Sequence, residues 1–278
     1  FFQGTVQLHS VSDPKSVAIG DVNNDTHPDI VVLTDQGDSV QTFLGAGDGT
    51  FPTVVGSRIS FIGSEGHNVV LGYFNSDQYL DLVWASGVAV AFQPGDGAGG
   101  FGPRQAFLSP GNSPAHISAG DFNEDAIPDI VVSYEDEPGS VGVHLGIGDG
   151  TFGLGTTFAT SPYAEGIAVA DFNNDTHLDL AVACFGGAVS LNVVSILMGN
   201  GDGSFNGKAD FIVSLNPFAV AAADFNGDGK PDLATTGWDG KVAVVLGNGA
   251  GSFGTKTEYA IGTRGRAIAV GDVDGDGK

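Results

Sequence analysis

A short acidic loop recurs about every fifty residues in this chain and constrains its fold more than any other feature. Each complete copy follows an apolar segment and carries an oxygen-bearing side chain at positions one, three, five and nine. The complete copies are Asp21, Asn23, Asp25 and Asp29; Asp121, Asn123, Asp125 and Asp129; Asp171, Asn173, Asp175 and Asp179; and Asp224, Asn226, Asp228 and Asp232. Three carboxylates crowded into one loop repel one another without a cation, and calcium takes six to eight oxygen ligands. These loops therefore predict four calcium sites.

Two alternatives compete with calcium binding by this loop. Asp, Asn and Gly favour turns because their side chains bond to their own backbone, but four copies in register with three carboxylates each favour a metal. An EF-hand needs a bidentate Glu at position twelve. The residues at that position are Val32, Val132, Val182 and Thr235. The EF-hand is therefore excluded.

Two further copies depart from the pattern. In the second copy Tyr73 replaces the first Asp, which leaves a weak or degenerate site. Its remaining ligands are Asn75, Asp77 and Asp81. The sixth copy begins with Asp272, Asp274 and Asp276, and the sequence ends before its ninth position. We expect about four to five structural Ca²⁺ ions, bound with unequal affinity.

Position six of the loop differs among the copies. It is Gly at Gly229 and Gly277, but Thr26, Ala126 and Thr176 occupy it elsewhere. A tight loop favours a positive φ at such a position, which glycine adopts readily and other residues adopt at a cost. We therefore expect the loops without glycine to bind calcium more weakly.

A second motif alternates with the acidic loop. It reads Gly-Asp-Gly-Thr-Phe at Gly47 to Phe51 and is echoed at residues 95–101, 148–152, 201–205 and 249–253. Together the two motifs resemble the FG-GAP or VCBS repeats of integrin α-subunit β-propellers and related bacterial surface proteins. The resemblance implies a further calcium ligand, the backbone carbonyl of position seven. Those residues are His27, Ile127, His177 and Lys230.

Each repeat contains four short strands by pattern. In the first repeat they are Ser16 to Gly20, Asp29 to Thr34, Val40 to Leu44, and Pro52 to about Ser60, and no segment shows a helical period. Four antiparallel strands per repeat of this length are typical of a β-propeller blade. We predict an all-β fold, and the recurrent Phe of the second motif is expected to wedge between blades.

The repeat divides the chain into the parts of a single propeller domain. The resemblance favours seven blades, with six as the alternative, and about five complete blades are present in this chain. The parts are residues 1–15 as the outer strand of the closing blade, 16–66, 67–114, 115–164, 165–217 and 218–265 as blades 1 to 5, and 266–278 as the start of blade 6. We expect residues beyond Lys278 to complete the ring.

Composition restricts the partners. The formal net charge is −23 with only 10 Lys and Arg residues, which argues against nucleic acid and anionic membranes as partners. No apolar run is long enough to cross a bilayer, so membrane insertion is not expected. The single cysteine, Cys184, excludes an intrachain disulfide, but calcium can replace disulfides in secreted proteins. We expect an extracellular or cell-surface protein.

The two motifs must lie on one face of the ring, and the remaining loops lie on the other. Those remaining loops vary from blade to blade, as recognition loops do on a rigid scaffold. The candidate binding residues on this variable face are Tyr134, Tyr163, Trp238, His67, His116, Arg264 and Arg266. We expect the two arginines to pair with a nearby Glu in preference to binding an anion from a partner.

Three classes of function remain. The resemblance to integrins favours a non-enzymatic adhesion or protein-binding module. The alternative is a lectin that binds carbohydrate between blades in the presence of calcium. A catalytic propeller fits less well, because the sequence shows no Ser-His-Asp order, no paired catalytic carboxylates outside the loops and no His or Cys cluster. We therefore expect a binding protein that recognises a protein or glycan ligand.

Overall fold

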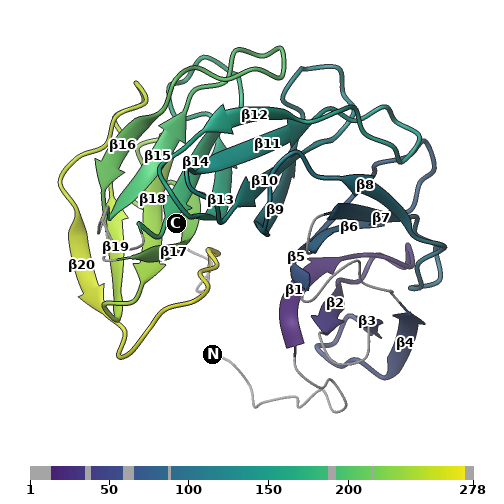
Figure 1. The fold of residues 1–278 in the computed structure, drawn as a ribbon. Coiled ribbons are helices and arrows are strands. Elements are labelled where there is room, and N and C mark those ends of the chain that lie inside the picture. Colours follow the sequence, from purple (N-terminus) through teal and green to yellow (C-terminus); the bar gives the residue numbers. More distant parts are fainter. Residues whose placement is uncertain are drawn as a thin grey trace.

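Five four-stranded antiparallel sheets stand side by side around a common centre, as blades of a propeller (Figure 1). The structure is a computed structural model and describes residues 14–34, 39–58, 66–86, 89–186, 192–213 and 216–272. No helix occurs in these ranges. The predicted all-β propeller fold is therefore confirmed, with five blades in this chain.

The strands follow one another in each blade without crossovers. Blade 1 contains β1 (Pro14–Gly20), β2 (Asp29–Thr34), β3 (Ser39–Leu44) and β4 (Thr53–Arg58). Blade 2 contains β5 (Gly66–Gly72), β6 (Asp81–Ser86), β7 (Ala89–Gln93) and β8 (Gln105–Leu108). Blade 3 contains β9 (Pro114–Gly120), β10 (Asp129–Tyr134), β11 (Ser140–His144) and β12 (Thr156–Ala159). Blade 4 contains β13 (Ala164–Ala170), β14 (Asp179–Cys184), β15 (Val193–Leu197) and β16 (Ala209–Ile212). Blade 5 contains β17 (Pro217–Ala223), β18 (Asp232–Gly237), β19 (Lys241–Val245) and β20 (Thr257–Ala260).

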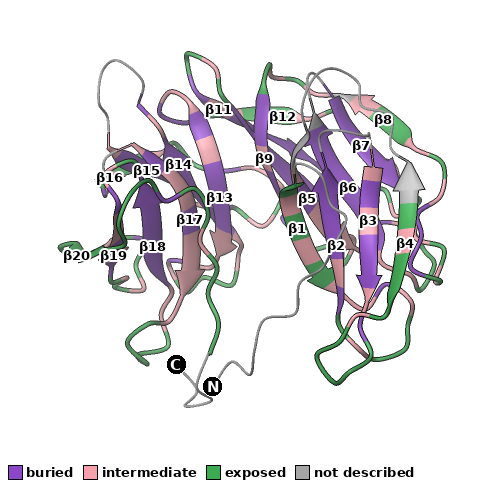
Figure 2. Cartoon of the chain, turned by 90° about the horizontal axis from the view of Figure 1, so that it is seen from below, coloured by how far each residue is buried: buried purple, intermediate pink, exposed green. Residues whose placement is uncertain are grey.

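The second strand of each blade lies between two other strands of its sheet, and in blades 2 to 4 it also lies between two neighbouring blades. Every residue of β10, β14 and β18 is buried, whereas the outer strands β12 and β16 are largely exposed (Figure 2). A strand that is covered on both faces reads as a continuous apolar run instead of an alternating one. This explains runs such as Ile130 to Val132 in the sequence.

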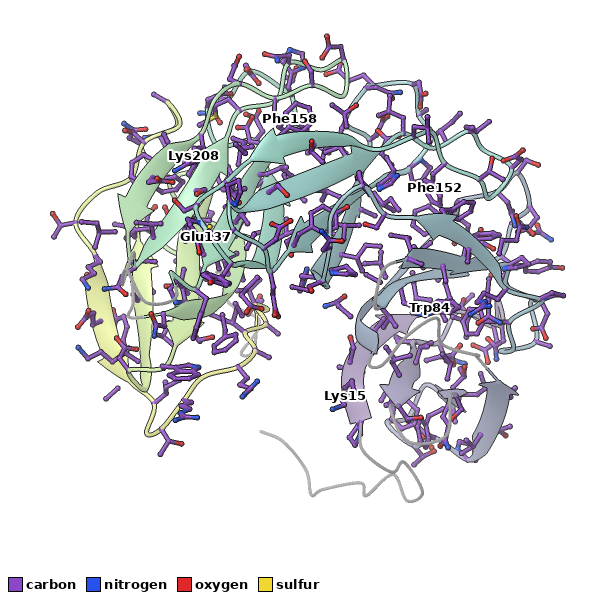
Figure 3. The ribbon with its side chains drawn as sticks, in the orientation of Figure 1. Lys15, Trp84, Glu137, Phe152, Phe158 and Lys208 are labelled. Carbon is purple, nitrogen blue, oxygen red and sulfur yellow. The ribbon has the colours of Figure 1, made fainter. Side chains whose placement is uncertain are left out.

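The hydrophobic core lies between blades. Each of its four clusters combines side chains of two adjacent blades, as where Trp84 of blade 2 joins Leu33 of blade 1. The recurrent Phe of the second motif contacts the preceding blade: Phe152 packs edge-on against Phe74 and Phe107, with ring centroids 5.7 and 5.6 Å apart (Figure 3). Phe205 and Phe253 make the equivalent contacts one and two blades further on. The expected wedge is observed.

The predicted strand ends in the first repeat agree with the structure to within two residues. Strand β2 has the predicted bounds, and β1 begins at Pro14 instead of Ser16. The segment from Ala267 to Gly271, expected to open a sixth blade, is not a strand in the structure, and no described segment pairs with it. Residues 1–13 and 273–278, which hold most of the expected closing strand and the end of the sixth loop, lie outside the described ranges. The total number of blades stays a prediction.

Candidate metal-binding loops and the opposite face

The acidic loops join the first and second strands of each blade, and backbone amides fix their side chains. In the third loop Asp121 accepts the N–H groups of Asp125 and Ala126 at 3.1 and 2.8 Å. Asn123 Oδ1 accepts the N–H of Asp125 at 3.1 Å, and Asp125 Oδ1 accepts that of Ile127 at 2.8 Å. The first, fourth and fifth loops repeat this ladder. Turn chemistry therefore organises positions one, three and five.

The ninth position has a second role that the sequence did not reveal. Asp129 is fully buried, and its Oδ2 accepts the N–H of Phe122 while its Oδ1 accepts the N–H of Gly146, both at 2.8 Å. The carboxylate thus joins its own loop to the residues that follow the third strand. The same pair of bonds recurs at Asp29, Asp81, Asp179 and Asp232. The retention of Asp81 in the degenerate second loop was the sequence signal for this role.

The loops fit a hard cation in donor type and in charge. All their side-chain donors are oxygens at positions one, three, five and nine. In the fourth loop burial first, and then the charges of Asp175 and Asp171, raise the pKa of Asp179 to about 6. The three carboxylates therefore repel one another across the loop, and a cation between them would relieve that repulsion.

In this structure, hydrogen bonds within each loop occupy carboxylate oxygens that a bound ion would contact. Asn123 Nδ2 donates to Asp125 Oδ2 at 2.9 Å. Among the residues that the structure describes, no three Asp, Glu, His or Cys side chains converge as a metal cluster. To bind calcium, the Asp125 carboxylate would have to release the Asn123 amide and contact the ion in its place. This exchange requires a rotation of one side chain. The predicted calcium ligands therefore stay a prediction.

The backbone of the loops is left-handed at position six, as expected. The φ angles are 74° at Thr26, 66° at Ala126, 77° at Thr176 and 79° at Gly229. Position four is also left-handed, with φ of 59° at Asn24, 60° at Glu124 and 60° at Asn174, which the sequence pattern did not show. Non-glycine residues in this region cost about 1–3 kcal/mol each unless the fold supports them.

The second, third and fourth acidic loops are also attached to the next blade. The N–H groups of Gly150, Gly203 and Gly251, in the second motif of one blade, donate to carbonyls in the preceding blade's acidic loop at 2.8–2.9 Å. Those carbonyls belong to Phe74, Phe122 and Phe172, at position two of the loop. The side chain at position four reaches the same neighbour, since Glu124 Oε1 lies 2.5 Å from His177 Nδ1. The two motifs therefore form one contact across every such blade junction.

The second loop keeps part of the ladder. Asn75 Oδ1 accepts the N–H of Asp77 at 2.7 Å, and Asn75 Nδ2 donates to Asp81 Oδ1 at 3.1 Å. Tyr73 is 50 % exposed at the first position and supplies no carboxylate there. In the sixth loop Asp272 is exposed, whereas Asp274 and Asp276 lie outside the described residues.

The prediction that Tyr134 belongs to an exposed binding face is wrong. Tyr134 ends strand β10, is 0 % exposed and packs in the core with Ile117 and Val132. Its hydroxyl accepts a hydrogen bond from Ser109 Oγ at 2.7 Å. Burial raises the pKa of Tyr134 to about 12. The sequence placed this residue in the following loop, but the strand continues one residue further and turns its ring toward the preceding blade.

The other candidates on this face differ in accessibility. Tyr163 is half-buried, has φ of 56° and donates its hydroxyl to Glu137 Oε2 at 3.4 Å. His116 is half-buried in β9, and burial lowers its pKa to about 4. His67 lies in β5, and its side chain is outside the described residues.

An aromatic cluster marks the variable face at blades 4 and 5. Trp238, which follows β18, is 38 % exposed, and its ring lies 5.1 Å from Phe185 and 6.0 Å from Phe218. The guanidinium carbon of Arg264 lies 4.3 Å from the Trp238 ring, and that of Arg266 lies 5.2 Å from the Phe218 ring. The expected pairing of these arginines with Glu is replaced by contacts with aromatic faces. Phe185 and Phe218 were not predicted as members of this face.

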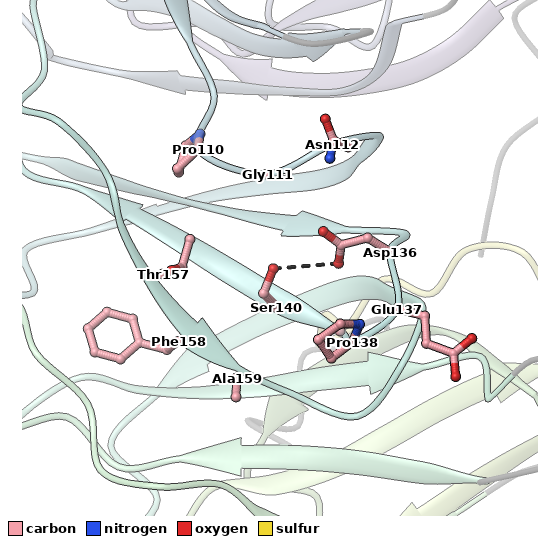
Figure 4. A pocket seen from close by; sticks show the side chains of 11 residues that line it. Pro110, Gly111, Asn112, Asp136, Glu137, Pro138, Ser140, Thr157, Phe158 and Ala159 are labelled. Atoms are coloured by element: carbon pink, nitrogen blue, oxygen red, sulfur yellow. Dashed lines mark hydrogen bonds between the residues drawn. The ribbon is translucent and has the colours of Figure 1, made fainter.

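Two cavities open on the variable side of the described structure. One, of about 570 Å³, lies between blades 2 and 3 and is lined by Asn112, Asp136, Ser140 and Phe158 (Figure 4). The other, of about 850 Å³, lies among the first strands at the centre and is lined by His116, Glu135, Glu165 and Arg266, among others. Burial first, and then the charge of Glu135, raise the pKa of Glu165 to about 8, although Arg266 opposes this shift.

A polar network between blades 3 and 4 contains possible catalytic residue types. Lys208 Nζ donates to Ser161 Oγ at 2.9 Å and pairs with Asp210, which also accepts Ser195 Oγ at 2.6 Å. Ser161 is only 2 % exposed, and its Oγ also donates to Asp210 Oδ2 at 3.0 Å, so this group lies inside the blade junction and not at an open site. Burial raises the pKa of the Cys184 thiol to about 11, so this thiol is not activated. The network holds two blades together.

Comparison with known proteins bears on the two repeated motifs. A family model described as an FG-GAP-like repeat matches residues 21–84, 73–132, 121–182, 184–235 and 224–278. This chain belongs to the FG-GAP-like repeat family. No curated protein matches the chain significantly. The described residues contain no helix that is long and apolar enough to cross a membrane.

One solved structure shares the fold of this chain at low sequence identity, and two others match it with lower TM-scores. An Agrocybe aegerita lectin, described in specific recognition of non-reducing terminal N-acetylglucosamine, matches with a TM-score of 0.56 and 18% identity over 88% of this chain. The match spans 65% of that lectin, slightly under two thirds of its length. BBS1N in complex with ARL6DN matches with a TM-score of 0.46 and 12% identity over 84% of this chain and 79% of its own. A Photorhabdus luminescens Tc holotoxin pore matches with a TM-score of 0.45 and 16% identity over 89% of this chain and 12% of its own.

The left-handed position six can be tested in both directions. Gly229→Ala is expected to lower the free energy of unfolding by about 1 kcal/mol, because φ there is +79° and an added Cβ meets no atom within 4 Å. Ala126→Gly is expected to raise it by up to about 1 kcal/mol for the same reason. Urea unfolding in the presence of a chelator measures both. Gly56→Ala is the control, because Gly56 also has open space but no positive φ. An equal loss at Gly56 and Gly229 would contradict backbone strain as the cause.

The carboxyl group of Glu165 in the central cavity predicts that the stability of the protein depends on pH. Burial raises the pKa of Glu165 to about 8 in the folded protein, whereas the unfolded chain releases this proton near the ordinary value of 4.5. The native state therefore binds more protons between these values, so stability falls as pH rises through this window and levels off above it. Glu165→Gln is expected to flatten this part of the curve and to be more stable than the parent at pH 8. Thermal unfolding from pH 4 to 9 measures this, with the exposed Glu137→Gln as control. Parallel curves for Glu165→Gln and the parent would refute it.

Proposed function

We propose that this chain is a non-enzymatic binding module that recognises a protein partner through the face opposite its acidic loops, outside the cell or at its surface. The observation that carries this proposal is the aromatic cluster of Trp238, Phe185 and Phe218. The cluster lies where second strands end and first strands begin, which is the side opposite the acidic loops.

The composition of this cluster suits protein recognition. Trp and Arg are enriched among the residues that carry most of the binding energy in protein interfaces. Here Trp238 is partly exposed, and its ring stacks on Phe218 and packs edge-on against Phe185. These contacts hold the ring in place before a partner binds. A rigid anchor loses little conformational entropy on binding.

We further propose that the four complete acidic loops hold structural Ca²⁺. The carboxylates at positions one, five and nine and the Asn oxygen at position three would be its ligands, with the carbonyl of position seven. Bound calcium supplies positive charge and no reaction chemistry here. The loop residues hold the backbone in its left-handed turns, and position nine ties that turn to the third strand.

A lectin is the second candidate, favoured by the cavity between blades 2 and 3. It combines a carboxylate at Asp136, an amide at Asn112, a hydroxyl at Ser140 and the apolar ring of Pro110. Directed polar groups beside an apolar surface are what a sugar ring requires. The Agrocybe aegerita lectin shares the fold, and that likeness alone does not extend its ligand to this chain.

The calcium proposal predicts different behaviour for positions five and nine. Calcium is expected to raise the melting temperature, since an ion at a hundred times its Kd adds about 2.7 kcal/mol per site. Asp125→Asn should lose part of this gain but resemble the parent in chelator, because an amide oxygen can still accept the N–H of Ile127. Asp129→Asn should be less stable by about 1–3 kcal/mol in both conditions, because it disturbs two buried hydrogen bonds. Melting curves that calcium leaves unchanged would count against bound calcium.

The binding face predicts the effect of removing one aromatic anchor. In a binding screen against displayed extracellular proteins, Trp238→Ala is expected to weaken capture by at least about tenfold, because its loss removes a supported aromatic surface. Tyr73→Ala is the matched control, since Tyr73 is 50 % exposed in an acidic loop on the other face. Unchanged melting temperatures would show that both variants fold.

A glycan array run with the same proteins separates the two candidate functions. Signals that free monosaccharide competes away, and that Asp136→Asn abolishes, would replace protein recognition with the lectin. Capture that Tyr73→Ala reduces and Trp238→Ala leaves intact would move the binding surface to the face of the acidic loops.

A further inference from the structure

Two of the chain's 10 basic residues stand side by side on the aromatic cluster. Arg264 and Arg266 follow β20, and their guanidinium groups lie over the rings of Trp238 and Phe218. Both residues are exposed. Among the residues that the structure describes, no carboxylate lies within ion-pair distance of either group. Within the described residues the two guanidinium groups therefore contact aromatic rings and form no ion pair.

The backbone that carries the arginines is fixed. Gly265 lies between them, is buried, and donates its N–H to the carbonyl of Gly237 at 3.0 Å. A Cβ at Gly265 would come within 2.7 Å of the Thr236 Cβ, so only glycine lies this close to β18. Ile261 donates in the same way to the carbonyl of Gly240 at 2.8 Å. The segment is thus attached to blade 5 on both sides of the pair.

A guanidinium group stacked on an aromatic face has a defined chemical preference. The ring covers one face of the plane, while the N–H groups at its edge stay available. These edges match a carboxylate with two parallel hydrogen bonds, which a lysine cannot reproduce. The ring also holds the guanidinium in place before the partner arrives.

The nearest acidic groups do not remove this preference. Glu165 influences Arg266 electrostatically across the central cavity, but burial and the charge of Glu135 raise the pKa of Glu165 to about 8. Glu165 is therefore mostly protonated at neutral pH and neutralises little of the Arg266 charge. Asp239 is adjacent to Trp238 in the chain, and its Oδ1 accepts the N–H of Lys241 at 3.2 Å.

The charge of the whole protein decides which carboxylate can reach this site. A net charge of −23 repels polyanions such as nucleic acids, sulfated glycans and anionic bilayers at long range. A single carboxylate on an otherwise uncharged segment suffers far less of this repulsion. Trp238 is 38 % exposed in contact with Arg264 and offers apolar surface to a neighbour of that carboxylate.

We propose that Arg264 and Arg266, held on Trp238 and Phe218, form a recognition site for an Asp or Glu side chain next to an aromatic residue in a peptide segment of the protein partner. This inference rests on the proposed function, and it adds the chemical class of the bound segment. The carboxylate is held by the two guanidinium groups, and the aromatic neighbour packs beside Trp238.

The test is an NMR titration of the ¹⁵N-labelled chain with the peptide acetyl-Gly-Phe-Asp-Gly-amide. The indole N–H of Trp238 reports binding, and that of Trp84, which is 1 % exposed between blades 1 and 2, is the internal reference. We expect a saturable shift of the Trp238 signal and an unchanged Trp84 signal. The matched peptide with Asn in place of Asp should bind at least about tenfold more weakly, which is about 1.4 kcal/mol.

Variants separate charge from geometry. Arg264→Gln and Arg264→Lys should each weaken binding of the Asp peptide by about tenfold or more, because Lys keeps the charge but lacks the planar pair of donors. Arg104→Lys, which lies before β8 in blade 2, is the control and should bind as the parent does. Melting temperatures equal to the parent's would show that the Arg264 variants fold. Equal binding of the Asp and Asn peptides, or of Arg264→Gln and the parent, would overturn the proposal.

Two further outcomes show which idea has failed. If free glucuronate or sulfate shifts the Trp238 signal as effectively as the Asp peptide, the site binds small anions and the peptide assignment is overturned. If Trp238→Ala abolishes protein capture but Arg264→Gln leaves both capture and peptide binding unchanged, the binding module stands and the carboxylate site falls. Loss of capture in both variants, with peptide binding lost in Arg264→Gln, supports the two proposals together.

Discussion

The buried carboxylate at the ninth position of each acidic loop is the interaction on which the rest of the structure depends. In all five blades it accepts one amide from the loop and one from the end of the third strand. A buried carboxylate is costly to desolvate, and paired N–H donors offset that cost. This bond holds the loop in place even in the second copy, where Asp81 keeps it although the first Asp is missing. The order of the loop therefore does not depend on a complete set of the proposed calcium ligands.

From this fixed loop the architecture extends to the neighbouring blade and then to the opposite face. The loop carbonyl at Phe122 accepts the amide of Gly203, and the Phe122 ring packs on Phe205, so one short segment supplies both polar and apolar contacts. With one face committed to these repeated contacts, the loops on the other face are free to differ. The cluster around Trp238 and the cavity near Asp136 occur there, each at one junction of the described blades.

The sequence was informative wherever a feature repeats within one blade. The strand limits, the left-handed position six and the Phe wedge follow from local patterns, and the structure agrees with them. The misses arise where residues of different loops or blades meet. The cluster of Phe185, Phe218, Trp238 and Arg264 joins three loops and strand β17, so no spacing along the chain could reveal it. Tyr134 was assigned to a loop because only one residue separates the end of its strand from that loop. The structural role of the ninth carboxylate was missed because a metal ligand would show the same repeated Asp.

At three successive blade junctions, a backbone N–H of the second motif donates a hydrogen bond to a carbonyl of the preceding acidic loop. These bonds use backbone atoms at equivalent positions. The donor is the N–H of a glycine and the acceptor is a backbone carbonyl, so the bond does not depend on the flanking side chains. This hydrogen bond can therefore form between neighbouring units whose other side chains differ. A gene that duplicates one unit would insert a ready-made neighbour, and the variable loops could then diversify without disturbing assembly.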